Sequence, residues 1–203
     1  RRVFAVAAGT DSVFTAGEDG QVRRWLIRGG EPEVLTKDRE AFHALVFEPR
    51  SGVLFAAGKD RRISRWDLQA KSPLADLAGH HDTVHCLALA GDGKTLLSAG
   101  SDRTARAWDA RTGQESRRFD GHPEEIFATA PLGDDGPCLL GGANGTIVVW
   151  DWKLGREIAR QKLIAGALAA AAIPKSNRAI VGLADGSVWM ASLNGSSDDG
   201  RNP

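Results

Sequence analysis

The segment LLSAGSDRTARAWD (96–109) holds two of the three residue types of a hydrolase triad. Ser98 and Asp102 lie in it, and His80 precedes them in AGHHDTV (78–84). A serine activated by a histidine that an aspartate orients is a nucleophilic catalyst. The same three side chains can also hydrogen-bond to one another inside a protein core. Whether the segment is unique in the chain decides between these interpretations.

The segment is one of five related segments. Four of them end in a tryptophan, at Trp25, Trp66, Trp108 and Trp150, and a fifth of the same shape ends in Ala191. Successive end points are 41, 42, 42 and 41 residues apart. A fixed period near 40 residues indicates a repeat architecture, so each motif has to be interpreted within its repeat.

Each repeat carries four strand signals separated by turns. In the third repeat they are an apolar run at 83–90, two further runs at 94–100 and 104–110, and a polar run at 114–120. Four antiparallel strands in about 40 residues form a propeller blade. We therefore predict an all-β fold, a β-propeller of four-stranded antiparallel blades with about five repeats visible. One blade cannot bury both of its faces alone, so the core should lie between blades.

Composition excludes several classes of function. The 203 residues include 26 basic and 26 acidic side chains, so overall charge implies no nucleic-acid or membrane partner. No apolar run approaches the roughly 18 residues of a membrane span. No signal peptide is visible, which slightly favours the cytoplasm. Cys86 and Cys138 lie in apolar runs and are expected to be small buried hydrophobes. We expect no cofactor and no metal.

The repeats resemble the WD-repeat family of β-propellers, over roughly residues 1–193. The markers are Gly-His pairs at 79–80 and 121–122, an aspartate six residues before the first three tryptophans, and Trp-Asp pairs at 66–67, 108–109 and 150–151. The resemblance implies that His80, Ser98, Asp102 and Trp108 form a buried hydrogen-bonded tetrad. Leaving such groups unpaired in a core would cost about 1–3 kcal/mol each. We therefore interpret the apparent triad as structural.

The full tetrad occurs in the third repeat alone. In the fourth, Leu140 stands at the serine position and Asn144 at the aspartate position. In the second, Asp38 stands at the histidine position and Ala56 at the serine position. Repeats two, four and five should therefore be less rigid than repeat three.

The predicted domain covers residues 1–193, and the polar tail 194–203 is expected to be disordered. The repeats span about 1–36, 37–78, 79–120, 121–162 and 163–193. Rings of the family usually have seven blades, so we expect five to be part of a larger ring. The missing blades would come from the same longer chain or from a second chain. A small five-bladed ring is a third interpretation.

The resemblance also implies a partner-binding surface, the top face around the channel. Its contact positions lie three and five residues after the histidine position and directly before the repeat aspartate. In this chain they are Arg2 and Glu18; Ala41, His43 and Lys59; Thr83, His85 and Ser101; Glu125, Phe127 and Ala143; and Gly166, Leu168 and Ala184. From these we select as partner-binding candidates Arg2, Glu18, His43, Lys59, His85, Glu125 and Phe127. A plainer interpretation is that His43 and His85 line a wet channel.

The predicted function is a non-enzymatic protein-protein interaction scaffold that binds proteins or peptides on this face. The alternative is a regulatory or sensing propeller of a larger multidomain enzyme or electron-transfer protein. A metal at His80, His81 and His85 is disfavoured, because no carboxylate or cysteine partner accompanies them. The basic pairs at 23–24 and 61–62 have acidic neighbours, which favours a solvated surface over nucleic-acid binding.

Overall fold

The computed structural model of the chain describes residues 2–36, 40–133, 136–174 and 176–192. Within these ranges it contains nineteen strands and no helix. The strands form five separate antiparallel sheets, each made of strands consecutive in the sequence. We call these sheets blades one to five.

The strand bounds follow the repeat. Blade one holds β1 (Val3–Ala8), β2 (Ser12–Gly17), β3 (Val22–Leu26) and β4 (Glu33–Thr36). Blade two holds β5 (Phe42–Glu48), β6 (Val53–Gly58), β7 (Ile63–Asp67) and β8 (Ser72–Leu77). Blade three holds β9 (Val84–Leu89), β10 (Thr95–Gly100), β11 (Ala105–Asp109) and β12 (Glu115–Phe119). Blade four holds β13 (Ile126–Pro131), β14 (Cys138–Gly142), β15 (Thr146–Asp151) and β16 (Arg156–Lys162). Blade five holds β17 (Ala167–Ala172), β18 (Arg178–Leu183) and β19 (Val188–Ser192).

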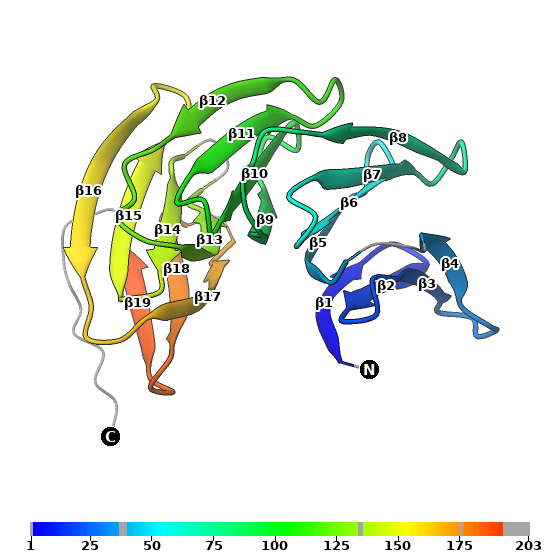
Figure 1. Ribbon diagram of the computed structural model, residues 1–203, viewed down its shortest axis with the longest axis horizontal. Coiled ribbons are helices and arrows are strands. Elements are labelled where there is room, and N and C mark those ends of the chain that lie inside the picture. The colour runs from blue at the N-terminus through cyan, green and yellow to red at the C-terminus, as the bar shows by residue number, and fades with distance from the viewer. Residues whose placement is uncertain (1, 37–39, 134–135, 175, 193–203) are drawn as a thin grey trace.

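The blades stand side by side in an open arc, with blade one at one end and blade five at the other (Figure 1). The first strands β1, β5, β9, β13 and β17 are neighbours in that order and line the inside of the arc. The predicted all-β fold of antiparallel blades is confirmed. Closure into a seven-bladed ring and the domain limits at 1–193 stay predictions. The tail 194–203 and Asp38 lie outside the described residues.

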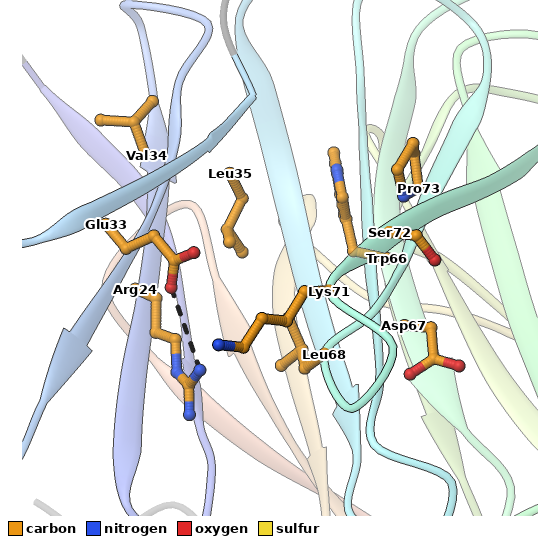
Figure 2. A pocket seen from close by; sticks show the side chains of 10 residues that line it. All are labelled: Arg24, Glu33, Val34, Leu35, Trp66, Asp67, Leu68, Lys71, Ser72 and Pro73. Atoms are coloured by element: carbon orange, nitrogen blue, oxygen red, sulfur yellow. Dashed lines mark ion pairs between the residues drawn. The ribbon is translucent and has the colours of Figure 1, made fainter.

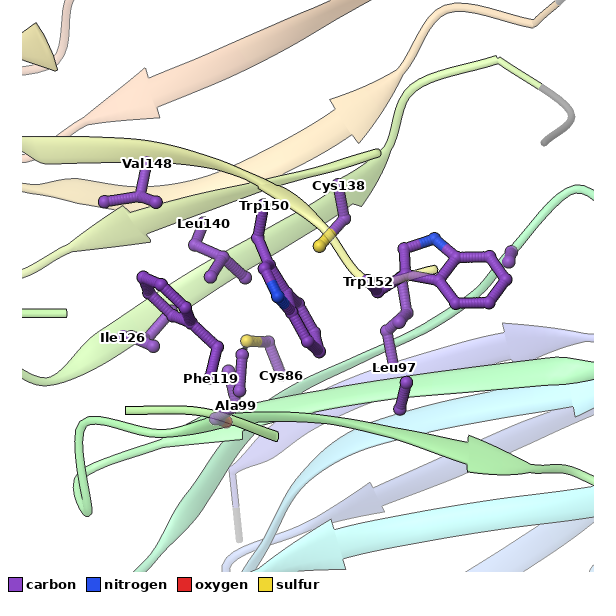
Figure 3. Close-up of a cluster of buried hydrophobic side chains, with 13 residues drawn as sticks. Cys86, Leu97, Ala99, Phe119, Ile126, Cys138, Leu140, Val148, Trp150 and Trp152 are labelled. Carbon is purple, nitrogen blue, oxygen red and sulfur yellow. Dashed lines mark hydrogen bonds between the residues drawn. The ribbon is translucent and has the colours of Figure 1, made fainter. Parts of the chain in front are cut away.

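The core lies between blades, as the repeat pattern predicts. Side chains of blades three and four meet in one buried cluster that surrounds Trp150 and includes Phe119, Cys86 and Cys138 (Figure 3). Both cysteines are free thiols, and burial raises the pKa of Cys86 to about 12. They therefore act as the small buried hydrophobes that the sequence predicts.

The apparent triad of blade three is a buried hydrogen-bond chain. Trp108 Nε1 donates to Ser98 Oγ at 2.8 Å, and Ser98 Oγ lies 2.7 Å from His80 Nε2. On its other side, His80 Nδ1 lies 2.8 Å from a carboxylate oxygen of Asp102. The hydroxyl of Ser98 is therefore used inside the core, where its residue is 1% exposed.

Asp102 collects several donors at the end of this chain. Its carboxylate accepts the backbone N–H of His81 at 3.0 Å and both the N–H and the hydroxyl of Thr104, at 3.0 and 2.9 Å. Burial raises the pKa of Asp102, but these hydrogen bonds and the one from His80 outweigh it and hold the pKa well below its usual range. The aspartate stays ionised and fixes the turn between β10 and β11.

Blade four lacks this chain, and its tryptophan has an unsatisfied N–H. Trp150 is fully buried, and its Nε1 has no hydrogen-bond partner among the described residues. Leu140 lies where a serine hydroxyl would accept the indole N–H of Trp150. His122 Nδ1 lies 2.8 Å from the carbonyl oxygen of Glu124 and takes no part in such a chain. An orphaned buried donor of this kind costs about 1–3 kcal/mol.

Asp102→Ala should lower the free energy of unfolding by about 1–3 kcal/mol, because it leaves the buried His80 N–H without an acceptor. Chemical denaturation with tryptophan fluorescence measures this change. An unchanged unfolding midpoint would show that the chain contributes nothing to stability.

The two buried tryptophans form a matched pair for testing the N–H itself. Trp108→Phe and Trp150→Phe remove the same atoms from buried sites, but only the first breaks a hydrogen bond. We expect Trp150→Phe to cost about 1 kcal/mol less than Trp108→Phe in the same denaturation experiment. Equal costs would contradict this account of blade four.

Candidate functional site

The inner strands of the first four blades present aromatic rings at the same strand position. The second residue of each strand is Phe4 in β1, His43 in β5, His85 in β9 and Phe127 in β13. Blade five continues the series with Leu168, which is 54% exposed. We call the four rings the aromatic row.

The rings of the aromatic row are in contact from blade to blade. Phe4 stacks on His43 with ring centroids 5.3 Å apart, and His43 meets His85 edge-on at 5.6 Å. His85 stacks on Phe127 at 4.3 Å. Aromatic pairs at such distances are favourable beyond the area that they bury. The row is therefore a continuous strip of rings across four blades.

A repeated β-bulge places these side chains. In all five blades the ladder between the first and second strands skips one residue, and that residue is Phe4, His43, His85, Phe127 or Leu168. A bulged residue has no ladder partner, and a bulge re-aims the side chain that it carries. The backbone approaches closely here, because a Cβ added to Gly100 would lie 2.0 Å from the Thr83 carbonyl oxygen.

One backbone hydrogen bond in each blade joins two of the predicted contact positions. The residue before the repeat aspartate donates its N–H to the carbonyl two residues before the bulged side chain. The five pairs are Glu18 to Arg2 (3.0 Å), Lys59 to Ala41 (3.0 Å), Ser101 to Thr83 (2.9 Å), Ala143 to Glu125 (3.0 Å) and Ala184 to Gly166 (2.8 Å). The predicted positions of each blade are therefore brought together beside the aromatic row.

Polar side chains connect the row to its rim between blades three and four. His85 Nε2 lies 2.8 Å from Ser101 Oγ, which donates to a carboxylate oxygen of Glu125 at 3.2 Å. At the other end of the row, the backbone N–H of Arg2 donates to the Glu18 carboxylate at 3.3 Å. The hydrogen bonds from His85 through Ser101 to Glu125 fix the imidazole of His85 in its stack on Phe127.

Both histidines of the row are held neutral. Burial lowers the pKa of His43, and the positive charge of Lys59 lowers it further. Burial also lowers the pKa of His85, as does nearby His43, while the carboxylates of Glu125 and Asp82 raise it less. At neutral pH the row therefore offers uncharged rings with charged groups at its rim.

The sequence prediction missed Phe4. Counting back from Trp25 by the spacing of the other repeats leads to Arg2, which precedes β1. The structure pairs Val3 with Gly17, fourteen residues on, whereas Phe42 pairs with Gly58, sixteen residues on. The first hairpin is thus two residues shorter, so a count back from Trp25 or from Gly17 by the spacing of the other repeats ends two residues before Phe4.

The site offers binding surface more than reactive groups. Ser98 is enclosed in the core, and no group of three or more potential metal ligands gathers within the described ranges. Across the same ranges no helix is long and apolar enough to span a membrane. Uncharged rings with a polar rim suit the side chains of a peptide or protein.

Comparison with known proteins agrees with this geometry. Residues 71–109 and 113–151 match the WD40 family, described as "WD domain, G-beta repeat". Rat (Rattus norvegicus) coronin-7 is 38% identical over 87 residues, which are 38% of this chain and 9% of that protein. The DENN domain and WD repeat-containing protein SCD1 of Arabidopsis thaliana is 30% identical over 84 residues, 40% of this chain and 7% of that protein. The matched part of the chain thus spans less than a tenth of either relative.

A solved structure shares the fold over nearly the whole chain. The structure titled "Structure of U3-55K" superposes with a TM-score of 0.80 at 18% identity, and the match covers 93% of this chain and 62% of that one. At this identity the likeness shows the fold alone. With five bladed repeats and the tetrad geometry in blade three, the chain has the fold of a WD-repeat β-propeller, and its residues 71–109 and 113–151 match the WD40 family itself.

Proposed function

We propose that this chain is a non-enzymatic scaffold that binds a partner protein or peptide on the aromatic row at the top face. Members of the family generally bind other proteins. The observation that carries the proposal is the unbroken contact of four rings from four blades, of which His43, His85 and Phe127 are partly exposed although their strand neighbours are buried.

The chemistry of the row favours apolar and aromatic partner side chains. Its rings are uncharged at neutral pH, and its rim carries charges of both signs, from Glu18, Lys59 and Glu125. Aromatic residues dominate the binding energy of many interfaces, while rim charges select partners and orient them. The proposal therefore places affinity in the row and specificity in the rim.

The alternative is a regulatory or sensing propeller within a larger multidomain protein. The name of the Arabidopsis relative places WD repeats together with a DENN domain, and the match covers 7% of its length. In that case the row would bind another domain of the same chain instead of a separate partner.

The double variant His85→Ala/Phe127→Ala should lose most partner capture, because it removes the tightest ring stack of the row. The measurement is affinity purification from a lysate with quantitative mass spectrometry. We expect at least a tenfold fall for specific partners, since interface hot spots cost about 2 kcal/mol or more each.

The matched control is Arg117→Ala/Ile158→Ala, which removes two exposed side chains from the outer strands β12 and β16. It should leave capture unchanged. Partners kept by the row variant and lost by the control would move the site to the outer strands.

Partner capture should also weaken as the pH falls from about 6.5 to 5. The pKa values of His43 and His85 lie below the ordinary 6.5, so the folded rings are neutral and take up protons only at lower pH. The unfolded chain binds protons first, so folding stability also decreases with falling pH in this range. Protonation puts two cations in adjacent rings of an apolar strip.

The control His43→Phe/His85→Phe keeps four rings and removes both titrating groups. Its capture and its melting temperature should depend less on pH between 6.5 and 5 than those of the wild type. Equal pH profiles would assign the dependence to other groups.

A further inference from the structure

A pocket that is separate from the aromatic row lies between the outer strands of blades one and two (Figure 2). It is a pocket of about 130 Å³, lined by residues of β3, β4, β7, β8 and the turn between β7 and β8. Its apolar part includes Leu35, Leu68 and Trp66, and its polar part includes Arg24 and Lys71. The strands that line it are the third and fourth of their blades, whereas the aromatic row is on the first strands. The pocket is therefore separate from the proposed top-face site.

The next two blade interfaces carry different side chains at the corresponding repeat positions. Between blades three and four stands Trp152, buried against blade three with its Nε1 donating to the Gly136 carbonyl at 3.1 Å. Leu68 stands at the same repeat position, two residues after the repeat tryptophan, between blades one and two. Leucine is smaller than tryptophan and leaves room.

Between blades two and three, a buried arginine bridges the interface. Arg65 donates from Nη1 toward the carbonyl oxygens of Ala110 and Arg111 in blade three, at 3.5 and 3.4 Å. Arg24 stands at the same repeat position in blade one but turns back to its own blade. Its Nε donates to Ser12 Oγ at 2.8 Å, and Glu33 is 3.9 Å away. No such bridge therefore closes the pocket between blades one and two.

Lys71 occupies a backbone position that favours glycine. Its φ is +52°, and the residues at the same distance after the tryptophan in the other four-stranded blades are Gly30, Gly113 and Gly155, all with positive φ. A left-handed conformation is costly for a residue with a Cβ. Retained backbone strain of this kind is often found at binding sites.

The side chain of this strained residue crosses the pocket. Figure 2 shows Lys71 extending from its turn toward the Arg24–Glu33 pair. Its ammonium makes no ion pair with a carboxylate of the described residues. Of the nearby acids, Glu33 faces Arg24, and the Asp67 carboxylate accepts the backbone N–H groups of Gln69 and Ala70 at 2.9 and 2.8 Å. The pocket thus combines an apolar floor with an ammonium group that makes no ion pair with the two carboxylates of its lining, Glu33 and Asp67.

We propose that this pocket binds a short peptide segment of a partner protein, with an apolar side chain on Leu35, Leu68 and Trp66 and an adjacent carboxylate on Lys71. The size fits one side chain, since a cavity of about 150 Å³ holds a benzene-sized group. The strain at Lys71 is retained because glycine there would remove the cation that recognises the carboxylate.

The test is selection of random heptapeptides displayed on phage against the wild-type protein, followed by binding measurements with the enriched peptides. We expect them to share an apolar residue next to Asp or Glu, and their affinity to fall at least tenfold for Lys71→Gln. Lys71→Gly should also lose binding, yet raise the melting temperature by about 2–4 °C, because it relieves the left-handed strain.

Two controls separate this site from the top face and from nonspecific charge. His85→Ala/Phe127→Ala should keep the enriched peptides, and so should Lys94→Gln, which removes one exposed lysine from another blade. Enriched peptides without an acid, or peptides that bind Lys71→Gln as well as wild type, would overturn the proposal. Peptides lost only in the row variant would overturn it too, while supporting the top-face site.

Discussion

A four-stranded blade has two apolar faces, and each can be buried only against another blade. The repeat tryptophan shows the consequence. Trp66, Trp108 and Trp150 are 9%, 2% and 0% exposed, because each packs against the preceding blade. Trp25 has the same position in blade one and is 41% exposed, although its indole N–H still donates to Thr15 Oγ1 at 2.8 Å. Burying a large apolar side chain stabilises a protein by about 1.5–3 kcal/mol. A further blade packed on the outer face of blade one or blade five would gain free energy in this way.

Polar groups in this core are tolerated to the extent that they are paired. Blade three meets the requirement with a chain from Trp108 through Ser98 and His80 to Asp102. Blade four replaces the serine by Leu140, gains apolar contact, and leaves the Trp150 N–H without a partner. Blades three and four thus have similar backbones, but they differ in whether the buried indole N–H of the repeat tryptophan is hydrogen-bonded. The histidine, serine and aspartate of blade three are explained by this need without any catalytic role.

The period of the sequence predicts the strands well, because alternation and turn residues act locally. The hydrogen-bond chain of blade three follows from the same repeat positions. The aromatic row was predicted only in part, since its contacts join residues about 40 positions apart. Phe4 was missed because a hairpin shortened by two residues changes the count from Trp25. The outer pocket was not predicted, because it depends on Arg24 turning to Ser12 while Arg65 crosses to the next blade.

The bulge explains how a rigid fold leaves the side chains of the proposed binding surface free to change. The bulged residue has no ladder partner and stands outside the buried clusters, so its side chain contributes little to the core. Its neighbours on either side, such as Phe42 and Ala44, are buried and carry the packing. The same backbone position therefore accepts Phe4, His43, or Leu168 at similar cost to the blade. Because stability and the proposed recognition depend on different residues of one strand, we expect that the rings of the row can be altered while the blades remain folded.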